Sequence, residues 1–380
     1  MWVLRGDQSA GGRGPDTGSR TRAPQPCHRA WWTPPARPYP EPVRLATYHR
    51  VTVVALALLV AIVVTGAGVR LTGSGMGCTD WPRCTEKTFT PSSDLHAKIE
   101  FANRMVTGLV SVAVAAAVLG SLRLRPRRRD LVWLSWGLVG GVIGQIVVGG
   151  LVVLSHLNPW LVQMHFVVSM VLIANALILR HRAARPASAT VRPSVTPALL
   201  RWGKVLLGLC VVVLLTGTLV TGSGPHSGHQ EADPGATLAE KVEAAGKIRR
   251  LPIDVSDAAR IHGVSMMLLL AATIWVIVQL RRHHRSNETL QRGTSALVTV
   301  LLLQAGLGYT QYFSGVPPLL VGLHVLGASR IFLMALQVLL DMTEPNPAGG
   351  LALESDPPAP ARSEGERSGD RPRGDLVTDR

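Results

Sequence analysis

The sequence predicts an all-α integral membrane protein, with eight transmembrane helices arranged as two tandem four-helix bundles. The first observation is hydropathy: 47% of the 380 residues are hydrophobic, and they gather into separate blocks. Each block is about 20 residues long, the length of helix that crosses ~30 Å of hydrocarbon while satisfying its own backbone hydrogen bonds. The second observation is the distribution of basic residues, and the third is an internal repeat.

The hydrophobic blocks differ in how they are connected. The third and fourth are joined by the short link LSHLNPW, and the seventh and eighth by FSGVPP, so each pair is predicted to form a hairpin. The other connections are longer and more polar. The spans are predicted at about 49–71, 99–121, 131–153, 160–180, 202–222, 260–280, 294–313 and 318–341.

Basic residues lie at alternate ends of these spans. Arginines crowd residues 123–129, and further Arg and Lys residues lie within 180–204 and 281–292, whereas the two short links contain neither. The positive-inside rule then predicts a multi-pass protein of the plasma membrane with both termini in the cytoplasm. The loops 72–98 and 223–259 are predicted to face outward.

Composition outside the spans excludes other roles. The net charge of +15 alternates with the spans rather than forming one basic surface, so we predict membrane lipid as the surroundings and no nucleic-acid partner. Residues 1–44 and 342–380 are rich in Pro, Gly and Arg and are predicted to be disordered cytoplasmic tails. Because 48 residues precede the first span and no A-x-A site follows it, we expect it to be retained rather than cleaved as a signal peptide.

Two of the four cysteines share the first outer loop. Cys78 and Cys84 stand in GCTDWPRC, where an outward-facing pair can form a small-loop disulfide in an oxidising compartment. The sequence favours this bridge but also allows two unpaired thiols, and it leaves open whether a bridge is structural or redox-active. Cys210, inside the fifth span, is most simply a small apolar residue, and Cys27 lies in the tail.

The chain contains a repeat of its own sequence. The 21-residue segments 145–165 and 304–324 align without a gap, and TGAGVRLTGSG at 65–75 resembles TGTLVTGSG at 216–224. The repeat predicts two halves in the same orientation, 45–181 and 202–341, joined by a cytoplasmic linker at 182–201 and related by an axis along the membrane normal. The recurring pairs are Gln145 and Gln304, Gly149 and Gly308, Ser155 and Ser314, Pro159 and Pro318, Leu161 and Leu320, and His165 and His324.

Three histidines lie just inside the outer ends of predicted spans. An ionisable residue inside a span suggests a functional site, although a single buried histidine is more simply structural. His165 and His324 lie at matching depths, and His262 opens the sixth span. We predict that His262 and His324 come from neighbouring helices and suit a haem iron with two axial nitrogen ligands. A zinc site is disfavoured, because no Cys, Asp or Glu is predicted to converge at that depth.

Aligning the sixth span on the second places Asn103 against His262 and Glu100 against Ala259. Glu100 and Asn103 are three residues apart and share a helix face. We infer that one half carries electrons while the other does chemistry, in which a carboxylate beside a porphyrin edge takes a proton. The alternative for Glu100 is an interfacial ion pair with Arg104 or Lys98.

The motifs RLTGSGMGCTDWPRC (70–84), IEFANR (99–104) and VTGSGPHSG (220–228), together with the four-plus-four plan, resemble the haem A synthase family. The resemblance covers about 45–341. It implies oxidation of a methyl group of haem O to the formyl group of haem A for cytochrome oxidase assembly, with haem b as cofactor. It also implies a haem O synthase as donor of the substrate, while the electron acceptor stays unidentified.

The resemblance further implies roles for particular residues. It implies haem b ligation by His262 and His324, substrate-haem ligation by His165, catalysis by Glu100, a substrate pocket with Asn103 and Arg104, and an outer-loop pair of Cys78 and Cys84.

The sequence departs from this family at two places. The family often has a histidine where this chain has Asn103, and His96 lies ~10 Å further along the same helix face. The second outer loop has no cysteine pair and is marked only by Pro225, His226 and His229.

Two other functions remain as alternatives. A quinol-linked membrane cytochrome b would use the same histidine pairs without needing Glu100. A transporter with parallel repeats would explain polar residues inside the spans, such as Asn175 and Arg330, but not the register of the histidines. Arg330 lies near the middle of the eighth span, where it pairs with a haem propionate or a polar neighbour, or marks a span that ends earlier.

Overall fold

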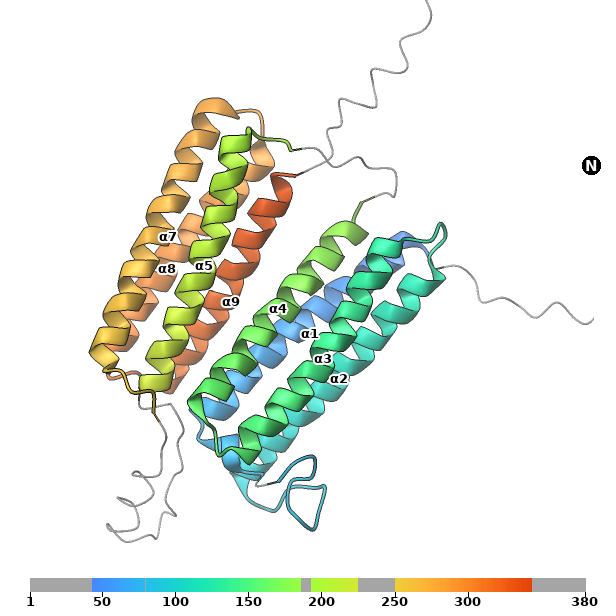
Figure 1. Cartoon of the computed structure of the whole chain (residues 1–380), viewed down its shortest axis with the longest axis vertical. Coiled ribbons are helices and arrows are strands. Elements are labelled where there is room, and N and C mark those ends of the chain that lie inside the picture. The colour runs from blue at the N-terminus through green and yellow to red at the C-terminus, as the bar shows by residue number, and fades with distance from the viewer. Residues whose placement is uncertain (1–42, 79, 186–192, 225–249, 344–380) are drawn as a thin grey trace, which may run out of the picture. The chain divides into compact units, whose positions relative to one another are not determined.

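The computed structural model describes residues 43–78, 80–185, 193–224 and 250–343 (Figure 1). Predictions for most of the two tails, for Cys27, for the middle of the 182–201 linker, and for Pro225, His226 and His229 lie outside these residues.

The described chain is entirely helical, apart from one isolated backbone bridge between Val43 and Leu124. Eight of its helices are long and apolar enough to cross a membrane, which confirms the predicted eight-span, all-α membrane fold. The helices are α1 (Leu45–Leu71), the short η1 (Ser74–Met76), α2 (Leu95–Arg123), α3 (Arg129–Leu154), α4 (Pro159–Ala183), α5 (Pro197–Ser223), α7 (Val255–His283), α8 (Glu288–Phe313) and α9 (Pro318–Asp341).

Most helices are longer than the hydrophobic blocks that predicted them, because polar caps extend their ends. The side chain of Asp94 accepts a hydrogen bond from the backbone N–H of Ala97 at 2.9 Å, so α2 begins four residues before the predicted 99. Asp254 caps α7 in the same way through the N–H of Ser256 at 2.7 Å. Hydrogen bonds from Ser256 hold the pKa of Asp254 below its usual value, so the cap is charged at neutral pH.

The two predicted hairpins have the same backbone conformation at equivalent positions. The link after α3 has positive φ at His156 (54°) and Leu157 (59°), and the link after α8 has positive φ at Gly315 (79°) and Val316 (61°). Residues other than glycine rarely adopt this left-handed region. Its recurrence at the same two positions means that the sequence repeat is also a repeat of backbone structure.

The helices pack as two rings of four. In the first, α1 packs on α2 and α4, and α3 packs on α2 and α4; in the second, α5 packs on α7 and α9, and α8 packs on α7 and α9 (Figure 1). Leu131, Leu138 and Leu297 are fully buried in the resulting core, whereas Trp133 and Phe313 are largely exposed on the flanks. Such exposed apolar side chains suit contact with lipid.

Hydrogen bonds also join the two rings. Gln163 of α4 donates through Nε2 to the backbone oxygen of Thr218 on α5 at 3.2 Å. Near the opposite ends of the helices, Arg180 of α4 donates to Oε1 of Gln337 on α9 at 2.8 Å. The two rings are therefore in contact at both ends, and α1 and α4 also pack against α9.

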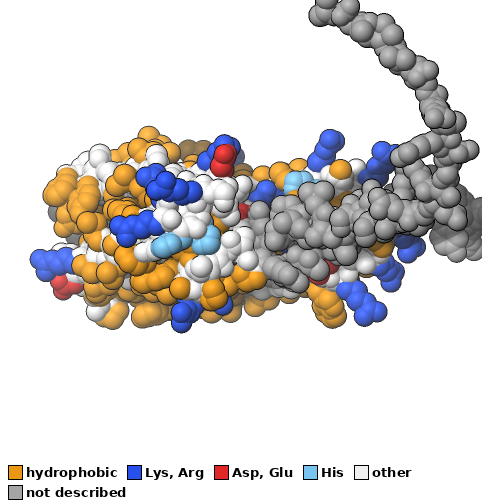
Figure 2. Space-filling view, turned by 90° about the horizontal axis from the view of Figure 1, so that it is seen from above, with side chains coloured by type: hydrophobic (Ala, Val, Ile, Leu, Met, Phe, Trp, Pro, Cys, Tyr) orange, Lys and Arg blue, Asp and Glu red, His pale blue; other side chains and the backbone are white. Residues whose placement is uncertain are grey.

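Basic side chains gather at the end where α2, α4 and α7 finish. Figure 2 views this end, with Lys and Arg side chains around it and hydrophobic side chains on the flanks. We refer to it as the inner end, after the predicted topology, and to the opposite end, where α2, α4, α7 and α9 begin, as the outer end. The prediction of cytoplasmic termini depends on this distribution of charge.

Candidate functional site

Two imidazoles face each other inside the second ring, near its outer end. His262 of α7 and His324 of α9 have ring centroids 6.2 Å apart, with an angle of 65° between the ring planes. The prediction that they come from neighbouring helices is wrong. Each of α7 and α9 packs on α5 and α8, so the two helices lie at opposite corners and the rings meet across the interior.

The hydrogen bonds of His262 leave one ring nitrogen available. Oγ1 of Thr216 lies 3.0 Å from the carbonyl oxygens of both Val212 and Val213, which can only accept, and 3.2 Å from Nδ1 of His262. Oγ1 of Thr216 also lies 3.0 Å from the hydroxyl of Ser265, so the direction of its bond to Nδ1 depends on the tautomer of His262. With the hydrogen on Nδ1, the lone pair of Nε2 is free to bind a metal, as is usual for a ligating histidine.

Each of the three histidines lies against a glycine of an adjacent helix. A Cβ at Gly217 would lie 3.2 Å from Cε1 of His262, and one at Gly308 would lie 3.1 Å from Cε1 of His324. In the first ring, a Cβ at Gly149 would lie 3.2 Å from Cε1 of His165. A side chain at any of these positions would contact the imidazole of the facing histidine too closely. The repeated Gly149 and Gly308 are therefore explained by the histidines that they face.

The repeated glutamines support the same histidines. Nε2 of Gln145 donates to the backbone oxygen of His165 at 3.1 Å, and Nε2 of Gln304 donates to that of His324 at 2.7 Å. Both bonds connect the helices of a hairpin. The two rings thus hold His165 and His324 in the same way.

Asn103 occupies the place of His262 in the first ring. The hydroxyl of Thr65 donates to Oδ1 of Asn103 at 2.8 Å, and a Cβ at Gly66 would lie 4.0 Å from Nδ2 of Asn103. These partners correspond to Thr216 and Gly217, which contact His262, in the alignment of 65–75 with 216–224. The alignment of Asn103 with His262 therefore agrees with the structure.

Glu100 is nearly buried, with 6% of its surface exposed, and both of its carboxylate oxygens are hydrogen-bonded. Oε2 accepts from the backbone N–H of Cys78 at 2.8 Å, and Oε1 accepts from the guanidinium of Arg104 at 2.7 Å. The alternative of an ion pair with Arg104 is therefore present. Two donors, one of them charged, stabilise the ionised carboxylate.

The outer loop is closed by a disulfide between Cys78 and Cys84, which confirms the predicted bridge over two free thiols. Both cysteines are buried, and they pack against Ala97 of α2. Arg104 donates to the carbonyl oxygen of Asp80 at 3.3 Å and to that of Arg83 at 3.0 Å. Arg104 thus holds the disulfide loop as well as Glu100, a role that the sequence did not predict.

Other polar residues of the first ring have structural partners. Nδ1 of His96 lies 3.0 Å from the hydroxyl of Ser74, at the start of α2. Asn175 donates through Nδ2 to the backbone oxygen of Leu134 at 3.0 Å, which joins α4 to α3. These contacts give both residues a place in the packing.

Arg330 lies midway along α9, and its side chain is exposed. The helix itself continues past Arg330 to Asp341, and whether the membrane span ends earlier stays open.

Side chains alone do not form a metal centre here. Among the described residues, no group of three or more His, Cys, Asp and Glu side chains could hold a metal ion. Two facing imidazoles instead suit a group that brings its own donors and needs only axial ligands, as a haem does.

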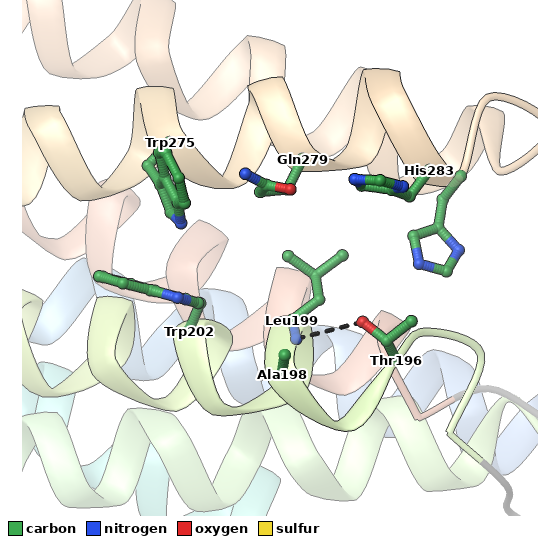
Figure 3. A pocket seen from close by; sticks show the side chains of 8 residues that line it. Thr196, Ala198, Leu199, Trp202, Trp275, Gln279 and His283 are labelled. Atoms are coloured by element: carbon green, nitrogen blue, oxygen red, sulfur yellow. Dashed lines mark hydrogen bonds between the residues drawn. The ribbon is translucent and has the colours of Figure 1, made fainter.

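A separate cavity lies at the inner end, between the start of α5 and the end of α7. Figure 3 shows Trp202, Trp275, Gln279 and His283 around it. Its volume is about 160 Å³, below the roughly 300 Å³ of a small-molecule pocket. It is also about 25 Å along α7 from His262 by helix rise, so it is not part of the histidine site.

Comparisons with known proteins find a matching family and several similar sequences. A family model described as COX15-CtaA, a cytochrome oxidase assembly protein, matches residues 49–336. A heme A synthase of Exiguobacterium sibiricum is 30% identical over 170 residues, which cover 44% of this chain and 56% of the relative.

Two further relatives are matched over most of their length. A heme A synthase of Bacillus pumilus is 25% identical over 272 residues, which cover 69% of this chain and 84% of the relative. A heme A synthase of Staphylococcus saprophyticus is 25% identical over 289 residues, which cover 74% of this chain and 91% of the relative.

Proposed function

The chain belongs to the COX15-CtaA family of cytochrome oxidase assembly proteins, and from this premise we propose how its residues divide the work of a haem A synthase. It is an oxidoreductase of the membrane that converts haem O to haem A, oxidising a methyl group to a formyl group. The observation that carries our proposal is the difference between two equivalent positions. The second ring has His262, and the first has Asn103, with Glu100 one turn away.

The second ring, within 202–341, is the proposed site of a resident haem b held by His262 and His324. The centroids of the two imidazoles lie 6.2 Å apart, so both would be available to hold the iron of a bound haem. A bound haem b supplies one-electron redox chemistry. Gly217 and Gly308 leave room for the imidazoles of His262 and His324, and Thr216 orients His262.

The first ring, within 45–181, is the proposed site of the substrate haem O, with His165 as its iron ligand. Asn103 lines this site on the side opposite His165, and Arg104 keeps the outer loop closed over its mouth. Glu100 is the proposed catalytic base. As a C–H bond of the reacting methyl group breaks, the carboxylate of Glu100 takes the proton and the two bonding electrons leave for the separate acceptor. Water then adds to the oxidised carbon and supplies the oxygen of the product.

Three further proposals concern the surroundings. Haem O comes from a haem O synthase, and the electrons pass to a separate acceptor. The protein lies in the plasma membrane, and both termini face the cytoplasm. The basic inner end supports this orientation, because positively charged loops stay on the cytoplasmic side. The tails and the linker 182–201 have no proposed catalytic part.

The alternatives explain fewer observations. A membrane cytochrome b gives no reason to bury Glu100 beneath a disulfide loop. A transporter gives no reason for the paired imidazoles, and Asn175, one of the residues that favoured it, bonds α3 instead of lining a path. The function is tested by expressing the chain in cells that make haem O but no haem A. We expect haem A in extracts of their membranes, and its absence despite inserted protein would contradict the function.

The disulfide offers a prediction about the position of Glu100. In the double variant Cys78→Ser with Cys84→Ser, we expect normal insertion and haem b content, but a rate of haem A formation lowered about 10-fold. Closing so small a loop contributes only about 2 kcal/mol to stability, whereas the N–H of Cys78 holds Oε2 of Glu100. Product analysis and haem content are measured beside Cys210→Ala, which removes the free buried thiol. Loss of insertion or of haem b would contradict this view.

Thr216 is expected to act through His262. In Thr216→Val the imidazole of His262 loses its hydrogen-bond partner at Nδ1, and losing such a partner typically lowers affinity for the bound metal group by 10–100-fold. We therefore expect weaker retention of haem b during purification and a shifted reduction potential. Thr218→Val is the control, because the Thr218 hydroxyl donates only to the backbone of its own helix. An unchanged potential and unchanged haem content would show that Thr216 does not orient His262.

A further inference from the structure

The two rings differ at one position that decides how an iron can be held. His262 and Asn103 are equivalent by sequence, by their threonine partners Thr216 and Thr65, and by the glycines beside them. Only the residue type differs. In the second ring the position supplies an imidazole that faces His324, and in the first ring it supplies an amide.

The amide of Asn103 is a poor ligand for haem iron. Its oxygen accepts the hydroxyl of Thr65 at 2.8 Å, and its nitrogen carries two hydrogens and has no lone pair to donate. An amide is also shorter than an imidazole. It therefore supplies no nitrogen at the place where Nε2 of an equivalent histidine would lie.

The other outer imidazoles of the first ring do not take the place of the missing histidine. Nδ1 of His96 lies 3.0 Å from the hydroxyl of Ser74, about 10 Å along α2 from Asn103. His156 is exposed in the link between α3 and α4. Of the described outer histidines in this ring, only His165 occupies the place of a repeat-related ligand.

We propose that the first ring binds its haem with His165 as the only protein ligand and leaves the opposite axial position open to a small exogenous ligand. The amide hydrogens of Asn103 border that open position. This inference rests on the proposed function, because it takes the first ring to be the site of haem O. Carbon monoxide is the probe, since it binds ferrous haem only where an axial position is free.

The difference in the number of histidine ligands predicts that haem leaves the first ring more easily than the second. A cofactor must stay bound, and two axial bonds from His262 and His324 hold it. A substrate must enter and its product must leave, and one axial bond from His165 is easier to break than two. The change from histidine to asparagine thus favours turnover in the ring that carries Glu100.

The test uses full-length purified protein with its resident haem, loaded with haem O. The spectrum of His165→Ala, treated in the same way, is subtracted to isolate the first ring. We expect a five-coordinate, high-spin haem there, and after reduction we expect half of the total haem to bind carbon monoxide. In Asn103→His, the added haem should be six-coordinate and low-spin, should reject carbon monoxide, and should leave the protein at least 10-fold more slowly.

A matched change in the other ring is the control. His262→Asn recreates the first-ring arrangement in the second ring. It should retain little haem through purification, and haem added back to it should be five-coordinate and should bind carbon monoxide. A wild-type first-ring haem that is low-spin and rejects carbon monoxide would overturn the open position while leaving the proposed function intact. No uptake of haem O that depends on His165 would overturn both.

Discussion

Replacing Glu100 with glutamine is expected to lower the rate of haem A formation by roughly 10²–10⁴-fold, the usual contribution of a general base, while the content of resident haem b stays unchanged. This loss corresponds to about 3–5 kcal/mol in the activation barrier. Glutamine has nearly the shape of glutamate and keeps an oxygen that accepts hydrogen bonds. What it loses is the negative charge and the capacity to take a proton.

The position of Glu100 makes this substitution informative. The carboxylate is 6% exposed and lies between the N–H of Cys78 and the guanidinium of Arg104. A glutamine oxygen can still accept one of these bonds, so the disulfide loop should stay closed. We therefore expect the variant to insert, to bind haem O, and to stall before the formyl product. Chromatography of the extracted haems should then show accumulated hydroxylated haem.

Two further variants separate catalysis from local structure. Glu86→Gln removes an exposed carboxylate of the same outer segment and should turn over normally. Asn103→Ala should be much milder than Glu100→Gln, because the amide only borders the site. Normal turnover in Glu100→Gln, together with an inactive Asn103→Ala, would mean that the roles are reversed.

The fold was predictable because burial in lipid leaves a strong signal in the sequence. Eight hydrophobic blocks gave eight helices, and the short links gave the two hairpins. The helix ends were less predictable, since they depend on caps: Asp94 starts α2 and Asp254 starts α7 within polar stretches that hydropathy does not assign to a span. Hydropathy also gives the order of helices but not their places in a ring. For this reason His262 and His324 were expected on neighbours and lie on opposite corners.

The site was predictable where the repeat supplied a comparison. It paired Asn103 with His262, and the threonine and glycine partners agree with that pairing. Thr216 itself was missed, although the repeated Thr-Gly at 65–66 and 216–217 was the available signal. A threonine in a helix usually bonds only its own backbone, so nothing in its type indicates a histidine partner. The loop contacts of Arg104 were missed because they depend on how the disulfide loop folds back onto α2.

Removing either imidazole of the second ring is expected to abolish stable binding of the resident haem. In His324→Ala, His262 would be the only one of the two imidazoles left to hold a haem, while Gln304 would keep its hydrogen bond to the backbone oxygen of residue 324. Among the described residues, no third His, Cys, Asp or Glu side chain joins these two histidines in a group that could hold a metal ion, so none is placed to replace the missing nitrogen. We expect the haem content of the purified protein to fall at least 10-fold, and the low-spin spectrum of the resident haem to disappear.

The loss should come from coordination and not from folding. Insertion depends on hydropathy and on the basic inner segments, so both His262→Ala and His324→Ala should reach the membrane in normal amounts. His283→Ala, at the exposed inner end of the same helix as His262, is the matched control and should keep its haem. Haemochrome analysis against protein concentration measures the outcome. A His324→Ala protein with full haem content and a six-coordinate, low-spin spectrum would place the resident haem elsewhere, and the division of work between the two rings would then fail with it.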